Sequence, residues 1–189
     1  RKNNKNNKNN KNNFEKYLLK NTAKNLIKKS NNYDLIDKNL FRKLNIKHLQ
    51  IIKKKFNLPN QFLLNICDND NVKEQNYLTL IKAIKILKKE KFDRKLFVLT
   101  KNNKQINVIQ KLLNDHKINT NIKILKNLNF FEIAGIYRHT SLIVLTPQNE
   151  NCTSLIFQSM NLNIPMIIND TKFVREITKN KYVYFNHTD

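Results

Sequence analysis

Several residue types and sequence features are scarce or missing in this chain of 189 residues. No run of about 18 apolar residues occurs, so we expect no membrane-spanning helix, and no charged start followed by an apolar stretch indicates a secretory signal. The two cysteines, Cys67 and Cys152, are far apart and lack the spacing of a metal site, which favours a reducing compartment. The chain starts with Arg1 instead of Met, so we expect it to be part of a longer protein.

Glycine occurs once and tryptophan never, whereas lysine, asparagine and isoleucine dominate. The abundant residues have AT-rich codons and the scarce ones GC-rich codons, so drift in base composition explains much of the formal net charge of +22. Such a charge would also attract nucleic acid or anionic lipid headgroups. The interleaved aromatic side chains and the reading helix of nucleic-acid-binding proteins are missing, so nucleic acid ranks last among the expected partners.

The first third of the chain differs in composition from the rest. Residues 1–61 contain 17 lysines and arginines against three acidic residues. Residues 1–13 repeat Lys-Asn-Asn without an apolar side chain, so this segment cannot offset its ordering entropy and is predicted to be disordered. Residues 14–61 are predicted to be a basic helical and linker region, with a short helix from His48 to Asn57 that Pro59 ends.

From residue 62 onward, short apolar runs alternate with segments of helical periodicity. Strands are predicted at 62–67, 96–99, 122–125, 142–145, 164–168 and 182–185, and helices at 77–88, 106–113, 130–137, 153–162 and around 174–177. This alternation predicts one α/β domain over residues 62–189, with a parallel sheet of about six strands and helices on both faces. Ligands of such sheets bind beyond the carboxyl ends of the strands.

Two features of the predicted helices concern packing. The sole glycine, Gly135, falls in mid-helix, where it is predicted to allow close packing of the helix on the sheet. Phe130 and Phe131 are predicted to pack in the core or between domains.

The most informative stretch runs from Thr146 to Met160, where a strand ends and a helix begins. Backbone N–H groups at a helix start offer a binding site for phosphate. Glu150 lies on the loop before the helix, and Gln158 follows eight residues later on the helix. Taken alone, Glu150 fits a solvated acid that the helix dipole favours better than a ligand contact, and Gln158 is also consistent with an exposed helix residue.

This stretch resembles the donor-site motif of the family 4 glycosyltransferases. That motif has a Pro-Ser, a short gap, Glu-Gly-Phe-Gly-Leu, three residues, Glu-Ala-Met, and then Gly-x-Pro-Val-Ile. Pro147, Glu150, Met160, Pro165 and Ile167 fall on its positions, and Gln158 takes the place of the second glutamate. Weaker matches extend the resemblance in order from about residue 37 to the end of the chain.

The resemblance implies a Rossmann-like domain, namely the C-terminal half of a two-domain glycosyltransferase of the GT-B type. Such enzymes transfer sugar from a nucleotide-sugar donor with retention, without a metal ion or other cofactor. It implies that Glu150 acts on the donor sugar, Gln158 on the ribose, and the N–H groups of Thr153, Ser154 and Leu155 on the diphosphate. The acceptor, whether glycan, lipid or protein, stays open. The expected location is the cytoplasm or the cytoplasmic face of a membrane, with peripheral membrane association as one option.

The chain departs from the family pattern at the phosphate site. Asn151, Thr153 and Asn163 replace glycines, and asparagine tolerates a left-handed backbone better than threonine does. Asp70 and Gln75 stand where the family has an Arg and a Lys that neutralise the diphosphate, so Lys73 is the predicted substitute cation. These departures leave an alternative open: a degenerate relative that binds a nucleotide or a protein partner but transfers no sugar.

Overall fold

The computed structural model describes residues 44–67, 75–92, 94–100, 102–118, 121–146 and 152–186. The predictions for residues 1–13, and most of those for 14–61, lie outside the described residues, as do Glu150 and Lys73. No helix within the described ranges is both long enough and apolar enough to cross a membrane.

Six parallel strands form a single sheet in the order β3-β2-β1-β4-β5-β6. The strands are β1 (Phe62–Cys67), β2 (Lys95–Thr100), β3 (Ile122–Leu125), β4 (Leu142–Leu145), β5 (Met166–Asn169) and β6 (Val183–Phe185). The sequence therefore predicted the number, the positions and the parallel direction of the strands correctly. Continuous apolar runs such as Leu96–Leu99 are buried on both faces, which is the environment expected of a strand covered by helices on each side.

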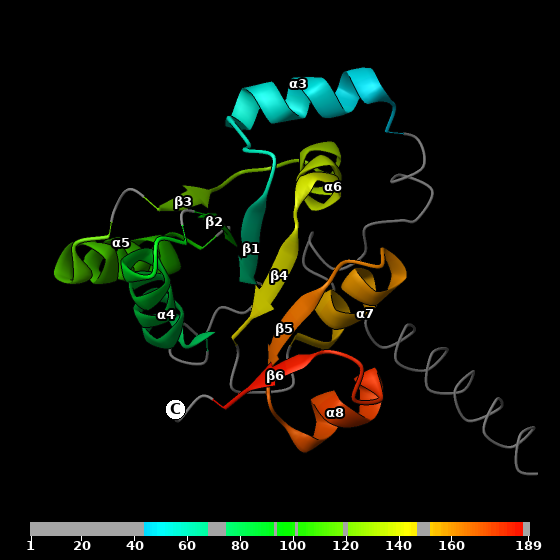
Figure 1. Cartoon of the computed structure of the whole chain (residues 1–189). Helices are drawn as coiled ribbons and strands as arrows, with labels where there is room; N and C mark the ends of the chain where they lie inside the picture. The colour runs from blue at the N-terminus through cyan, green and yellow to red at the C-terminus, as the bar shows by residue number, and fades with distance from the viewer. Residues whose placement is uncertain are drawn as a thin grey trace, which may run out of the picture. The chain divides into compact units, whose positions relative to one another are not determined.

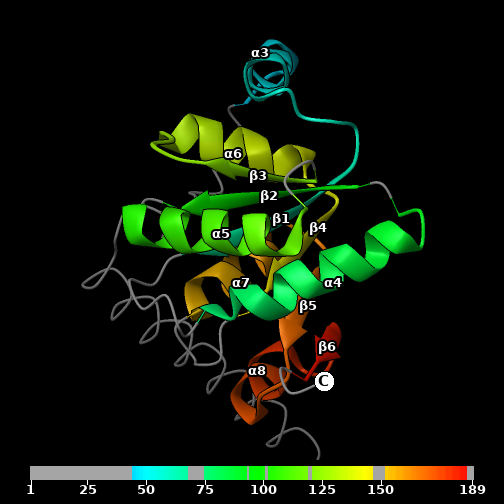
Figure 2. The same cartoon turned by 90° about the vertical axis from the view of Figure 1, so that its left-hand side faces the viewer.

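Helices cover both faces of the sheet. They are α3 (Ile46–Phe56), α4 (Tyr77–Lys89), α5 (Asn103–His116), α6 (Phe130–His139), α7 (Thr153–Asn161) and α8 (Lys172–Thr178). Figure 1 shows α4 and α5 on one face and α6 and α7 on the other. A quarter turn shows α3 lying outside α6, so that this side of the sheet carries a second layer of helix (Figure 2).

Helix α5 is longer than its apolar periodicity predicted. The Asn102 side chain accepts a hydrogen bond from the Lys104 N–H and fixes the helix start, and Lys117 adopts a left-handed conformation that ends it. Capping extends a helix beyond its apolar stripe because it satisfies the end groups that the stripe does not reach.

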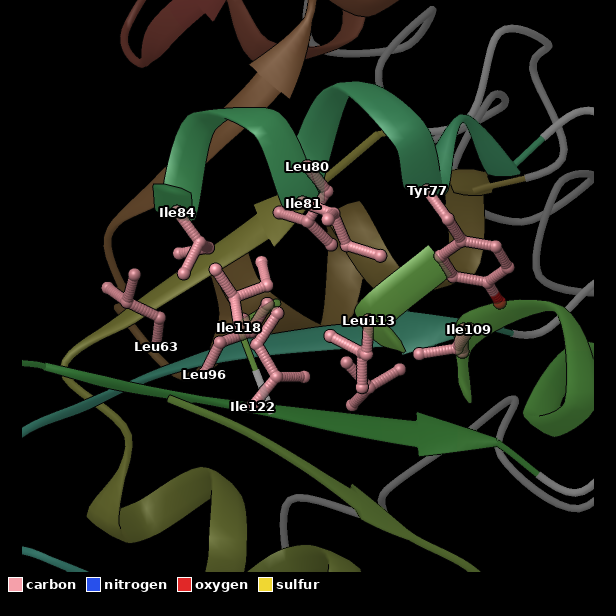
Figure 3. Packing of buried hydrophobic residues seen from close by; sticks show 11 residues of the cluster. Leu63, Tyr77, Leu80, Ile81, Ile84, Leu96, Ile109, Leu113, Ile118 and Ile122 are labelled. Atoms are coloured by element: carbon pink, nitrogen blue, oxygen red, sulfur yellow. The ribbon is translucent and has the colours of Figure 1, made fainter. Parts of the chain in front are cut away.

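A hydrophobic cluster fills the space between α4, α5 and the sheet. Leu80, Ile81 and Ile84 project from one face of α4 toward Leu96 of β2 and Ile109 of α5 (Figure 3). These positions on α4 follow the spacing of an amphipathic helix, so burial of one face fixes the helix on the sheet. The cluster holds the helix start at Tyr77 in place, and that start borders the candidate site described below.

The sequence predicted that Gly135 lets its helix pack closely on the sheet, but the structure shows a different partner for this position. A Cβ atom at this position would lie 2.3 Å from Ile52 Cδ1, so the absent side chain makes room for α3 instead. The prediction was wrong about the partner because helical periodicity shows that a residue lies on a helix face, but not which element covers that face.

Two polar contacts fasten α3 to α6 on either side of this crossing. Lys55 pairs with Glu132 in the first turn of α6, and His139 at the other end of α6 lies 3.0 Å from the Leu49 carbonyl through its Nε2 atom. Burial alone would raise the pKa of Glu132, but hydrogen bonds from Lys55 and from the Asn129 N–H hold that pKa below its ordinary 4.5.

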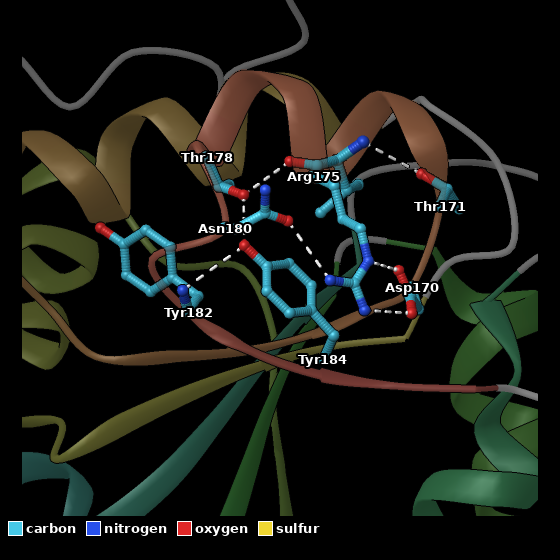
Figure 4. A network of polar contacts seen from close by, with 8 residues as sticks. Asp170, Thr171, Arg175, Thr178, Asn180, Tyr182 and Tyr184 are labelled. Atoms are coloured by element: carbon cyan, nitrogen blue, oxygen red, sulfur yellow. Dashed lines mark hydrogen bonds and ion pairs between the residues drawn. The ribbon is translucent and has the colours of Figure 1, made fainter.

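A polar network closes the end of the sheet around α8 and β6 (Figure 4). The Arg175 guanidinium donates to both carboxylate oxygens of Asp170, at 2.5 and 2.6 Å, and to Asn180 Oδ1 at 3.2 Å. It also lies over the Tyr184 ring, 4.6 Å from the ring centroid. The fork geometry of arginine suits this arrangement, in which one side chain ties together β5, α8 and β6.

Candidate functional site

The strand order reverses between β1 and β4, and this reversal marks the candidate site. From β1 the chain continues to β2 on one side, whereas from β4 it continues to β5 on the other. In parallel sheets of this kind the two connections leave in opposite directions at such a point, and ligands bind in the crevice between them, which here corresponds to the carboxyl ends of β1 and β4. Gln75 follows β1 and Thr146 follows β4 at this edge.

Buried polar side chains gather at the carboxyl edge of the sheet. They include Gln75, Thr100, Gln105, Thr146, Gln158 and Asn169, which either end a strand or lie in the segment that follows it. The Thr146 hydroxyl donates to the Gln75 carbonyl over 2.7 Å and so ties the two sides of the crevice together. Buried polar groups in an otherwise apolar core are normally hydrogen-bonded within the protein or face a ligand.

The helices that flank the crevice differ from the others in how they begin. Helices α3, α5, α6 and α8 each donate a backbone N–H hydrogen bond to the side chain of their own N-cap residue. Asn76 before α4 and Cys152 before α7 make no such capping bond. The two helices at the reversal point, α4 and α7, thus begin without a cap from their own N-cap side chain. The positive ends of their dipoles lie at this edge of the sheet.

Three of the residues predicted to bind the diphosphate form the first turn of α7. Thr153 is the first helical residue and is half-buried, and Ser154 and Leu155 follow it with buried side chains. The side chains of Ser154 and Leu155 are therefore covered by protein, and what these two positions can present to a ligand is backbone. A helix start with backbone N–H groups and no acidic residue in its first turn is suited to an anion.

Gln158 lies on the next turn of α7 and is 4% exposed. Its amide oxygen accepts a hydrogen bond from the Tyr137 hydroxyl over 3.1 Å. This bond fixes which end of the amide faces Tyr137, because of the two amide ends only the oxygen can accept from a hydroxyl. The role of Gln158 toward a ribose stays a prediction.

The structure separates the glycine replacements by their backbone geometry. Asn163 has a φ of 53°, so the left-handed conformation that asparagine was predicted to tolerate is present. Thr153 is helical and not among the positive-φ residues, so its β-branched side chain causes no strain of that kind. Asn151 lies outside the described residues. Gln75, at the position of the family's lysine, has a buried side chain.

Sequence reasoning gave no role to Tyr137 or Thr146. Both are buried and both donate to a group at the crevice, Tyr137 to Gln158 and Thr146 to the Gln75 carbonyl. Their hydroxyl groups are a signal that the sequence offers, because a buried hydroxyl requires a hydrogen-bond partner. Tyr137 was also predicted to lie on a helix, and that helix, α6, packs beside α7.

The sequence from residue 43 to 187 matches the family of group 1 glycosyl transferases. The chain belongs to this family. No curated protein sequence matches it significantly. Solved structures similar to this chain have the GT-B glycosyltransferase fold, and this fold agrees with the architecture that the sequence predicted.

Solved structures with this fold include a glycosyltransferase from Rickettsia africae, with 16% identity and a TM-score of 0.66 over 78% of this chain and 40% of that one. Anabaena HepE, in complex with UDP and glucose, has 12% identity and a TM-score of 0.64 over 78% of this chain and 40% of HepE. A C-terminal domain of a group 1 glycosyl transferase from Francisella tularensis has 14% identity and a TM-score of 0.57, and the match covers 72% of this chain and 73% of that domain. This chain thus spans about two-fifths of the Rickettsia africae protein and of HepE, and the match covers most of the isolated Francisella tularensis domain.

Proposed function

We propose that this chain is the donor-binding half of a family 4 glycosyltransferase, a retaining and metal-independent enzyme that transfers a sugar from a nucleotide-sugar donor to an acceptor. The crevice between β1 and β4 carries the proposal, because the two helices without a cap from their own N-cap side chain both begin there. A diphosphate requires N–H donors and a positive potential, and helix starts supply both. The presence of UDP and glucose in the HepE structure makes uridine nucleotides the first donors to test.

In this proposal the donor lies along the start of α7. The diphosphate accepts hydrogen bonds from the N–H groups of residues 153–155, the ribose lies toward Gln158, and the transferred sugar contacts Glu150. Lys73 supplies the positive charge that the family's Arg and Lys would give. When the glycosidic bond breaks, negative charge develops on the leaving nucleoside diphosphate, and the N–H groups and helix dipole stabilise it without reorganising.

The acceptor is a glycan, a lipid or a protein that the remaining part of the enzyme binds. The cytoplasm is the proposed location, because the two cysteines, Cys67 and Cys152, are far apart in the sequence and lack the spacing of a metal site, which favours a reducing compartment.

Calorimetric titration with nucleoside diphosphates and nucleotide sugars tests the proposal. Gln158→Ala removes a neutral hydrogen bond and should weaken binding by about two- to tenfold. Ser159→Ala is the matched control, because this neighbouring buried hydroxyl donates within α7 to the Leu155 carbonyl and faces no ligand in the proposal. Glu150→Gln should leave nucleotide affinity unchanged and lower transfer, and a chelator should affect neither.

Three results would change the assignment. Absence of binding by every nucleotide at millimolar concentration would leave the protein-binding, inactive relative as the better description. Binding without transfer by the full-length protein would indicate a nucleotide-binding relative that has lost activity. Equal affinities for wild type and Gln158→Ala would show that the ribose does not lie at this turn of α7.

A further inference from the structure

The outward side of α3 and the first turn of α6 carry large apolar side chains that the described fold does not cover. Ile46 and Ile51 on α3 are 74% and 63% exposed, and Phe130 and Phe131 on α6 are 45% and 54% exposed. Half of the exposed large hydrophobic side chains in the described part of the chain thus lie on these two helices. The packing of Phe130 and Phe131 that the sequence suggested does not take place in the core of the described domain.

An ion pair joins the end of α3 to the start of α6, next to several of these side chains. Lys55 in the last turn of α3 pairs with Glu132 in the first turn of α6. Phe131 directly precedes Glu132, and Ile51 lies one turn before Lys55 on the same face of α3. The exposed aromatic pair therefore adjoins the exposed side of α3.

Two lysines without a described acidic partner lie beside Ile51 on α3. Helix α3 has four lysines and no acidic residue. Lys53 donates to Asn60 and Lys55 pairs with Glu132, but Lys47 and Lys54 form no ion pair with any described residue. Both lie one turn from Ile51, on opposite sides of it along the helix. We call the five residues Lys47, Ile51, Lys54, Phe130 and Phe131 the α3–α6 patch.

We propose that the α3–α6 patch binds the surface of an anionic lipid bilayer. Aromatic and aliphatic side chains reach the boundary between headgroups and acyl chains, while lysines beside them attract the lipid phosphates. The patch presents both kinds of side chain, and its two lysines have their charge uncompensated by described acids. It gives the group 1 glycosyltransferase domain a membrane-facing side built from α3 and α6, independent of the donor crevice.

Flotation of the full chain with lipid vesicles tests this proposal. We expect binding to vesicles that contain roughly 30% phosphatidylglycerol in phosphatidylcholine, weak binding to phosphatidylcholine alone, and a decrease with added salt. Lys47→Gln with Lys54→Gln should weaken binding by roughly tenfold or more, because each lysine near an anionic surface contributes about a fivefold factor. Phe130→Ser with Phe131→Ser should weaken binding to a similar degree and leave its salt dependence intact.

The outer face of α4 offers matched controls. Ile86 is 57% exposed, and Lys82 and Lys85 lie beside it on a helix that also has no acidic residue. Ile86→Ser, and Lys82→Gln with Lys85→Gln, should leave vesicle binding unchanged within about twofold. Circular dichroism checks the fold of every variant, and the lysine pair tests the proposal even where the serine pair unfolds.

Several outcomes would overturn the proposal. Wild-type protein that does not float with anionic vesicles would do so directly. Equal losses from the α4 variants and the patch variants would show attraction by overall charge without a specific surface. A concentration-dependent dimer in ultracentrifugation that the serine pair abolishes, together with no flotation, would assign the patch to contact between protein chains. Nucleotide titration of the same variants keeps this result separate from the donor site.

Discussion

Replacement of Gly135 by alanine tests the crossing of α3 and α6 with one added methyl group. The new Cβ atom would lie 2.3 Å from Ile52 Cδ1, 3.0 Å from Cγ2 and 3.2 Å from Cγ1. Ile52 is buried, and as a β-branched residue in a helix it has one strongly preferred χ1 rotamer, so Cγ1 and Cγ2 stay close to the new methyl group even where rotation about χ2 moves Cδ1. Overpacking of this kind costs roughly 1–3 kcal/mol. The better helix propensity of alanine offsets about 1 kcal/mol, so the free energy of unfolding should fall by up to about 2 kcal/mol.

Ile52→Val distinguishes the predicted clash from other effects of Gly135→Ala. It removes Cδ1, the atom nearest to the new methyl group, and alone should cost about 0.5–1.5 kcal/mol. In the double variant the closest contact is absent, so the two costs should not add, and the shortfall should be about 1 kcal/mol or more. Urea unfolding of the four proteins, followed by circular dichroism, measures this coupling. Additivity within about 0.5 kcal/mol, or a Gly135→Ala protein more stable than wild type, would refute the packing account.

Three further substitutions test charge and backbone conformation. The lowered pKa of Glu132 means that its stabilising effect is complete above the unfolded-state pKa and is lost as the pH falls through the folded-state value. Glu132→Gln should therefore be less stable than wild type at neutral pH, and the difference should shrink below a pH of about 4 in thermal unfolding. Lys117→Gly, at a φ of 56°, should raise stability by about 0.5–1 kcal/mol, because glycine avoids left-handed strain. Asn57→Gly, at a φ of 52°, should change stability less because asparagine tolerates that conformation, and an equal gain at both positions would contradict this reasoning.

The sheet was predictable because its strands are short, apolar and buried on both faces. The run of residues 62–67 has no polar alternation, and every strand after it is separated from the next by a helical period. Such an alternation permits few topologies, since crossovers between parallel strands have one hand. Lateral helix contacts were not predictable in this way. Ile52 packs against Gly135, although the two positions are 83 residues apart in the sequence. The sequence pattern around one position does not indicate that it contacts the other.

The site was predictable in its position but only partly in its contacts. The helix start at Thr153 and the turn that carries Gln158 follow from periodicity and from the family motif. The bond between Tyr137 and Gln158 depends on how α6 and α7 lie side by side, and that distance is a property of packing. The same limit applies to the capping of helices: the absence of a side-chain cap at Asn76 could not be inferred, because asparagine is among the best N-cap residues.

The scarcity of glycine has different consequences at different turns. In the described residues, all eight positive-φ positions are asparagine or lysine, and Gly135 is not among them. Where asparagine replaces a family glycine after α7, as at Asn163, the backbone takes the required conformation at a modest cost in strain. Thr153 raises a different question, because its backbone is helical and unstrained and the added side chain stands at the helix start where a phosphate would approach. Substitution of glycine after α7 therefore affects stability, whereas substitution at the start of α7 affects access to the N–H groups. Whether this chain still binds a donor depends on the second kind of change, and general stability measurements will not report it.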